Sequence, residues 1–291
     1  MNALLALVAV LGVSASGPLM AATPAAPLAI AMWRNAGAAL VSAPFAVTSL
    51  AAARRRRPSA RTWAGCVIAG VMLAGHFATW VTALKLTSVA AATALVSSQV
   101  VWVVVVDWLT GQSISIAVVT GTFLAVCGVV VITGVDFTLS ARALTGDLLA
   151  VAGGFFAALY LLAGQRVRTS MSTGLYTTTC YGVCALVLTA AALMFGIDLV
   201  GLSSRAWLMI AAVMISAQLF GHSLLNYLLA VMRPRLVAML LLLEVPGAAL
   251  LAGVFLSQAP AWGVYAGLII IVCGLIVVTL RRRPADPLPA G

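Results

Sequence analysis

Residues 111–133 read GQSISIAVVTGTFLAVCGVVVIT, and residues 257–279 read SQAPAWGVYAGLIIIVCGLIVVT. The two stretches align without a gap at an offset of 146 residues, which pairs Gln112 with Gln258, Gly121 with Gly267, Cys127 with Cys273, Gly128 with Gly274 and Thr133 with Thr279. Apolar coincidences mean little in such a sequence, but matched Gln, Cys and Gly residues at one offset are hard to obtain by chance. We therefore infer an internal duplication.

The same offset joins the only two histidines of the chain. His76 and His222 are 146 residues apart, and each follows a glycine, Gly75 or Gly221. The duplication thus reaches back from the quoted stretches over the third to fifth apolar runs of the chain and, correspondingly, over the eighth to tenth.

The composition excludes a water-soluble fold. Of the 291 residues 64% are hydrophobic and 8% are charged, whereas soluble domains have about 25% charged residues. A helix of about 20 apolar residues crosses the hydrocarbon core of a bilayer. Apolar runs of roughly this length lie at about 3–21, 26–50, 62–84, 89–108, 114–134, 145–165, 174–195, 205–230, 235–256 and 260–280,.

These runs predict an all-α, polytopic membrane protein of about ten transmembrane helices. No basic region precedes the first run, so we expect a retained first helix and not a cleaved signal peptide,. The five cysteines lie in apolar runs without CxxC spacing, which favours packing residues over disulfides or metal ligands,.

The positive charges predict the orientation, because Lys and Arg in short loops stay on the cytoplasmic side of a membrane. With both termini inside, twelve of the sixteen basic residues face the cytoplasm, namely Arg54 to Arg57, Arg61, Arg166, Arg168, Arg233, Arg235 and Arg281 to Arg283. Lys85, Arg142 and Arg205 fall outside, and Arg34 lies within the second run.

Five helices per half is an odd number, so the second copy enters the membrane upside down relative to the first. We predict a first five-helix repeat over residues 1–140, an inverted second repeat over residues 141–280 and a cytoplasmic tail over residues 281–291. Inverted repeats are the architecture of many secondary transporters, whose substrate sites lie near the midplane between the copies.

Short motifs add a resemblance. The chain has Gly17-Pro18 in the first run, Trp33-Arg34-Asn35 in the second, Ala90 to Thr93 opening the fourth and Glu244-Val245-Pro246 in the ninth. It resembles the ten-helix EamA-type transporters of the drug/metabolite transporter superfamily over essentially its whole length. That resemblance implies export of small metabolites, amino acids or toxic compounds. The family usually has a glutamate where this chain has Gln112 and Gln258, so roles that need charge at those turns are not carried over.

Glu244 and Arg34 are ionisable residues at membrane depth, where such groups usually face the bundle interior or a wet cavity. We expect the Glu244 carboxyl to bind a proton or a cationic solute, unless it is a neutral acid hydrogen-bonded to a neighbouring helix. Arg34 is expected to form a structural ion pair, with Glu244 or Asp147 as partner by depth. The resemblance likewise places an arginine at this position outside the central cavity.

Two polar stripes contain the histidines. Positions four apart share one helix face, which groups Met72, His76 and Trp80 in one half and Gln218, His222 and Asn226 in the other. Ser98 is the counterpart of Glu244 at the 146-residue offset. Imidazoles titrate near pH 6.5, which suits proton coupling, although a histidine bridging two helices is the plainer interpretation. The predicted substrate-binding residues are His76, Trp80, Ser98, Gln99, Gln218, His222, Asn226 and Glu244.

The sequence as a whole predicts a secondary transporter that exports a small solute across an inner membrane by alternating access. Proton coupling is one option for its energy source, and we expect a monomer or a homodimer. No nucleotide-binding loop, cofactor motif, metal site or protease motif is found, so ATP use and catalysis are not expected,. The alternative is a passive facilitator or a non-transporting membrane scaffold.

Overall fold

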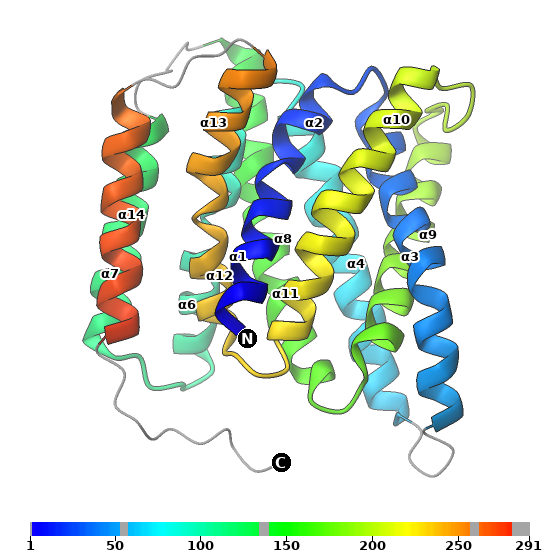
Figure 1. The fold of residues 1–291 in the computed structure, drawn as a ribbon, viewed down its shortest axis with the longest axis horizontal. Coiled ribbons are helices and arrows are strands. Elements are labelled where there is room, and N and C mark those ends of the chain that lie inside the picture. The colour runs from blue at the N-terminus through cyan, green and yellow to red at the C-terminus, as the bar shows by residue number, and fades with distance from the viewer. Residues whose placement is uncertain (1, 53–57, 134–139, 257–261, 281–291) are drawn as a thin grey trace.

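The computed structural model describes residues 2–52, 58–133, 140–256 and 262–280, and these are helical apart from short turns (Figure 1). The helices are α1 (Asn2–Ser14), α2 (Ser16–Ala22), α3 (Pro27–Ala52), α4 (Ala60–Ala83), α5 (Val89–Val96), α6 (Gln99–Leu109), α7 (Ile116–Thr133), α8 (Ala141–Arg168), α9 (Thr173–Met194), α10 (Ser204–Val213), the π-helix η1 (Met214–His222), α11 (Ser223–Leu228), α12 (Pro234–Leu241), α13 (Glu244–Leu256) and α14 (Trp262–Leu280).

Each predicted apolar run coincides with one helix or with a succession of helices. Seven of them are long and apolar enough to cross a membrane: α1 with α2, α4, α5 with α6, α8, α9, α10 with η1 and α11, and α12 with α13. Within α7 and α14 the apolar segments Ile116–Val131 and Tyr265–Gly274 are shorter. The all-helical membrane fold is thus confirmed, and seven of the ten expected spans meet this criterion.

Serine side chains explain where five helices begin. Ser59, Ser88, Ser140, Ser172 and Ser203 each accept a hydrogen bond from the backbone N–H three residues later, at 3.1–3.3 Å. The first turn of a helix leaves its N–H groups without backbone acceptors, and a serine at this position supplies one. These caps therefore set the first residues of α4, α5, α8, α9 and α10.

Several apolar runs form two or more helices in succession, and two of these interruptions occur at corresponding places in the two halves. α5 gives way to α6 at Ser97 and Ser98, and α12 gives way to α13 at Leu242 and Leu243. The second break follows from Pro246, which has no N–H and whose ring excludes a regular bond to the carbonyl of Leu242. The first break contains no proline, but the Ser97 hydroxyl donates to the carbonyl of Thr93 at 2.8 Å and competes with the backbone there,.

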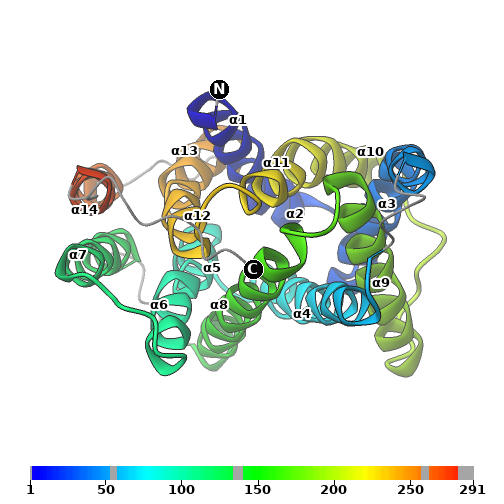
Figure 2. The same ribbon diagram turned by 90° about the horizontal axis from the view of Figure 1, so that it is seen from below.

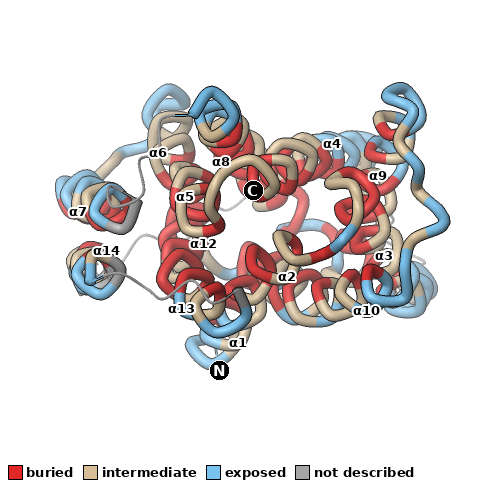
Figure 3. Tube along the Cα trace, turned by 90° about the horizontal axis from the view of Figure 1, so that it is seen from above, coloured by how far each residue is buried: buried red, intermediate tan, exposed pale blue. Residues whose placement is uncertain are grey.

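The bundle has a central group of helices and two flanking pairs (Figure 2). α7 packs on α14 at one side and α3 packs on α9 at the other. Seen along the helices, buried residues gather in the centre and exposed ones face outward (Figure 3). The outward side chains include large apolar ones such as Leu40, Leu186 and Val254, as expected of a surface that faces lipid.

Glycines bring α7 and α14 together at two points. A Cβ on Gly128 would lie 2.7 Å from the carbonyl oxygen of Gly267, and one on Gly274 would lie 2.6 Å from that of Gly121. The two contacts are equivalent at the 146-residue offset, because Gly128 corresponds to Gly274 and Gly267 corresponds to Gly121. Small residues allow such close approach of helices in membranes, so these glycines permit the tight packing of α7 on α14.

α1 begins and α14 ends at the same end of the bundle (Figure 1). α3 ends, α8 ends and α12 begins at this end too, which brings Arg61, Arg166, Arg168 and Arg235 to it. The predicted cytoplasmic residues Arg54 to Arg57 and Arg281 to Arg283 lie outside the described residues. At the opposite end the Lys85 ammonium donates to the carbonyls of Ala21 and Thr23 at 2.9 and 2.7 Å, and burial lowers its pKa.

Candidate substrate cavity

A small cavity lies between the two interruptions, in the centre of the bundle. Its volume is about 20 Å³, which is room for a water molecule,. Residues from both halves line it: His76, Trp80, Gln99, Ala157, Tyr160, Leu161, His222, Leu225, Leu241 and Glu244. Five of the eight predicted substrate-binding residues, namely His76, Trp80, Gln99, His222 and Glu244, are therefore on its wall.

The two histidines meet at this cavity. The ring centroids of His76 and His222 are 6.4 Å apart, and His76 stacks on Trp80 with centroids 5.4 Å apart. A ring nitrogen of His76 also contacts the carbonyl of Gly153 at 3.1 Å, which ties α4 to α8. That contact is the helix-bridging role that the plainer interpretation assigned to a histidine, and His76 has it while also lining the cavity.

The glycine before each histidine allows the neighbouring helix to come close. A Cβ on Gly75 would lie 2.9 Å from the Phe156 ring of α8, and a Cβ on Gly221 would lie 2.6 Å from the Val13 side chain of α1. Any larger residue at either position would push the helix, and the histidine after it, away from its partner. The repeated Gly-His pair is thus a packing device that places both imidazoles.

The other polar groups come from α6 and α13, the second helices (half-helices) of the two interrupted spans. Gln99 is the first residue of α6 and Glu244 is the first residue of α13. Glu244 accepts a hydrogen bond from the hydroxyl of Ser16 at 3.3 Å, and Ser16 itself begins α2 after a break in the first span. Interrupted helices whose ends meet near the middle of a bundle are typical of substrate sites in transporters.

Tyr160 is a wall residue that the sequence did not predict. Its hydroxyl donates to the side-chain oxygen of Asn226 at 2.5 Å, and the Asn226 amide donates to the hydroxyl of Tyr181 at 3.2 Å. The Tyr181 hydroxyl in turn lies 3.1 Å from that of Ser223. Asn226 is therefore behind the wall, where its side chain fixes Tyr160.

Ser98 and Gln218 also lie off the wall. The Ser98 hydroxyl is buried without a hydrogen-bond partner among the residues that the structure describes, and a Cβ on Gly154 would come within 2.7 Å of it. Gln218 is fully buried; its amide donates to Asn35 at 3.0 Å and its oxygen accepts from Arg34 at 2.6 Å.

The expected ion pair of Arg34 is not formed. Within the described residues its guanidinium is paired neither with Glu244 nor with Asp147; it donates to Gln218 and to the sulfur of Met20, at 2.6 and 3.2 Å. The guanidinium carbon lies 4.3 Å from the centre of the Phe77 ring, a cation–π contact. Depth in the membrane could not decide between these partners, because an amide and a ring at the same depth also stabilise a guanidinium.

The described residues contain no group of three or more His, Cys, Asp or Glu side chains suited to a metal ion. The wall instead carries two imidazoles, one carboxyl, one amide, the rings of Trp80 and Tyr160 and four aliphatic side chains. Mostly apolar walls with a few polar groups are typical of sites for small molecules.

The sequence profile of the EamA-like transporter family matches residues 1–134 and again residues 144–280. The chain belongs to this family. This EamA-like protein is accordingly a multi-pass membrane protein of a family that transports small solutes, as the motifs implied, and the two matches repeat the duplication seen in the sequence.

Other comparisons describe the fold alone. A solved crystal structure is similar to this EamA-like chain with a TM-score of 0.77 and 20% sequence identity, covering 98% of this chain and 99% of that one. A search of curated proteins found no match to this chain. The fold therefore has a solved counterpart of the same extent.

Proposed function

We propose that this protein is a secondary transporter that exports a small metabolite, an amino acid or a toxic compound by alternating access. The observation that carries the proposal is the central cavity, to which both halves contribute an imidazole and the first residue of a half-helix. A non-transporting scaffold has no need of polar groups that face an enclosed space at membrane depth, because each of them is costly there.

In this proposal the halves, residues 1–140 and 141–280, are inverted repeats with ten spans in all. The ten are the seven long apolar spans described above together with α3, α7 and α14. Two sets of contacts support it. α4 packs on α8 in the way that η1 packs on α1, and the glycine contacts between α7 and α14 exchange at the 146-residue offset. Both termini then lie in the cytoplasm, at the end of the bundle where the described arginines gather.

Transport requires the cavity to grow. A volume of about 20 Å³ is too small for a metabolite,, so a solute enters only when the halves move apart at one end. Similar halves that rock about a shared site give two such states of comparable energy, one open to each side.

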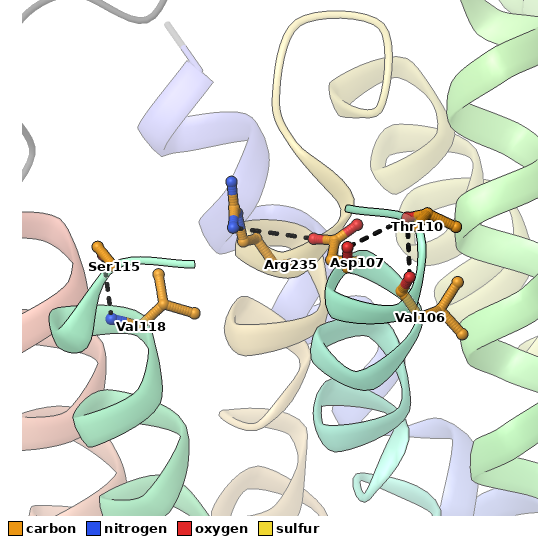
Figure 4. Close-up of polar contacts among 6 residues, drawn as sticks. All are labelled: Val106, Asp107, Thr110, Ser115, Val118 and Arg235. Atoms are coloured by element: carbon orange, nitrogen blue, oxygen red, sulfur yellow. Dashed lines mark hydrogen bonds and ion pairs between the residues drawn. The ribbon is translucent and has the colours of Figure 1, made fainter. Parts of the chain in front are cut away.

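The two ends of the cavity differ in chemistry. At the end where α1 begins, Arg235 of α12 and Asp107 of α6 form an ion pair of 3.8 Å (Figure 4). The 146-residue offset maps these residues onto Val89 and Gly253, at the opposite end, where α5 packs on α13. We propose that the halves are held together at the first end by this ion pair, and at the second end by apolar packing and by the hydrogen bond that Arg142 donates to the carbonyl of Lys85.

Export and its coupling to protons are tested in liposomes. Purified protein is reconstituted into liposomes loaded with the twenty amino acids and a set of small organic acids and amines, and the release of each is followed by mass spectrometry with and without a pH gradient. A gradient-driven exporter releases at least one solute faster when the gradient is imposed.

Glu244→Gln and His222→Ala each remove a wall group that can bind a proton. We expect both to abolish the response to the gradient, while Asp198→Asn, the same type of change at an exposed position outside the helices, retains it. Release that ignores the gradient in every variant would leave a passive facilitator. Release no faster than from protein-free liposomes would refute transport of these solutes.

A further inference from the structure

Arg34 is a buried positive charge close to the cavity. The residue has no exposed surface. Within the described part of the chain its Nε has no hydrogen-bond partner and no carboxylate is paired with the guanidinium. Its main polar and aromatic partners, Gln218 and Phe77, are uncharged, so no group in direct contact neutralises the guanidinium.

The distance from this charge to the cavity is short. The guanidinium carbon is 4.3 Å from the Phe77 ring centre, and that centre is 5.4 Å from the His222 ring centre. Arg34 is thus within about 10 Å of a ring on the cavity wall. With an effective dielectric constant of about 20, a unit charge at that distance changes the affinity for another unit charge by roughly tenfold.

The charges of the occluded cavity must nearly balance, because an excess charge away from water is costly. Glu244 is the one carboxylate on the wall as described. Arg34 with an ionised Glu244 sums to zero, and a zwitterion leaves that sum unchanged. An anion also brings the sum to zero when Glu244 is protonated, whereas a cation leaves an excess of one positive charge in the best case.

The Trp80 indole gives an independent indication. Trp80 is 2% exposed and lines the cavity, yet its N–H has no acceptor among the described residues. A buried N–H without a partner is costly. A solute that carries an acceptor, such as a carboxylate, satisfies it, and an alkylammonium group does not.

We infer that Arg34 sets the charge selectivity of the cavity, which accepts zwitterions and organic anions that carry a carboxylate and discriminates against organic cations. This inference rests on the proposed transport function. Arg34 acts at a distance through its charge, while Trp80 contacts the carboxylate of the solute.

The test compares, at pH 7.5, solutes that share one side chain and differ in their charged groups. Leucine, 4-methylpentanoate and 3-methylbutylamine form one such set, and phenylalanine and tryptophan with their deaminated and decarboxylated counterparts form two more. Binding to the purified protein in detergent is measured from the ligand-dependent rise in unfolding temperature. For the wild type we expect the acid or zwitterion of at least one set to bind about tenfold more tightly than the matched amine.

The variants separate charge from structure. Arg34→Gln removes the charge but retains an amide that can donate to Gln218, and we expect it to lose the preference. Arg34→Lys and Gln218→Leu retain a positive charge at position 34 and should keep the preference for the acid or zwitterion. Should Arg34→Gln fail to fold, Glu244→Gln tests the same balance from the other side, because losing its negative charge should increase the preference for anions by a similar factor.

The outcomes also distinguish the inference from the transport proposal. Amines that bind and are released from liposomes as readily as the matched acids would overturn the charge selectivity and leave transport intact. A preference that survives in Arg34→Gln would assign selectivity to another residue. Wild-type protein that binds no member of any set would overturn the inferred selectivity, while the transport proposal is decided separately by the release assay.

Discussion

The ion pair between Asp107 and Arg235 makes a quantitative prediction about which end of the cavity opens. The charged atoms are 3.8 Å apart and the side chains are 9% and 16% exposed, Arg235 being the less exposed. At an effective dielectric constant of about 20 the attraction is about 4 kcal/mol. Desolvation of both groups offsets much of it, so we expect the pair to stabilise the closed end by about 1–2 kcal/mol, a factor of roughly 5–30 in population.

The perturbation is Asp107→Asn, which removes one charge and keeps the size of the side chain. Leu241→Cys provides the probe, because Leu241 lines the cavity, in a background in which the five native cysteines are replaced. A membrane-impermeant maleimide is applied from the side where α1 begins. The labelling rate should rise by about 5–30-fold, in proportion to the open population.

Exchanging the charges supplies the control. The double variant Asp107→Arg with Arg235→Asp restores an attractive pair, so labelling should return toward the wild-type rate. Equal labelling rates in wild type and Asp107→Asn would show that the pair does not hold this end closed. Faster labelling from the opposite side would reverse the assignment of the two ends.

Two further predictions concern the cavity wall and the α7–α14 pair. Tyr160→Phe leaves the side-chain oxygen of Asn226 without its donor and should destabilise the protein by about 1–3 kcal/mol, seen as a lower unfolding temperature in detergent; an unchanged temperature would mean that water replaces the hydroxyl. Gly128→Ala places a methyl group 2.7 Å from the carbonyl oxygen of Gly267 and should cost about 1–3 kcal/mol. Gly182→Ala, with nothing within 4 Å of the new Cβ, should be neutral or stabilising, and similar effects of the two substitutions would argue against close glycine packing.

The sequence predicted the positions of the helices well, because hydrophobic length and charged turns determine them. It also predicted that His76 and His222 belong to one site, since the repeat gives them equivalent places. The packing role of Gly75 and Gly221 was not predicted, although the repeated Gly-His pair was visible. A glycine signals close approach only when the partner helix is known.

Other features left no usable pattern in the chain. Tyr160 maps onto Ser14 at the 146-residue offset, so the repeat could not single it out. The break at Ser97 contains no proline, and the hydroxyl-to-carbonyl bond there also occurs at Thr189 within the uninterrupted α9, so the residue types do not mark the break. The partner of Arg34 depended on how η1 packs against α3, which hydropathy does not record.

The contact between Arg34 and Gln218 joins residues 184 positions apart, and this separation has a consequence for biogenesis. A chain is inserted in the order of its synthesis, so α3 reaches the bilayer long before the helix that shelters its guanidinium has been translated. An arginine at the centre of a lone helix costs about 2.5–3.5 kcal/mol on insertion scales. Until then Met20 and Phe77, which belong to the same half, are the groups of this site that can contact the guanidinium, and we expect the first half alone to be less stable in the bilayer than the complete chain.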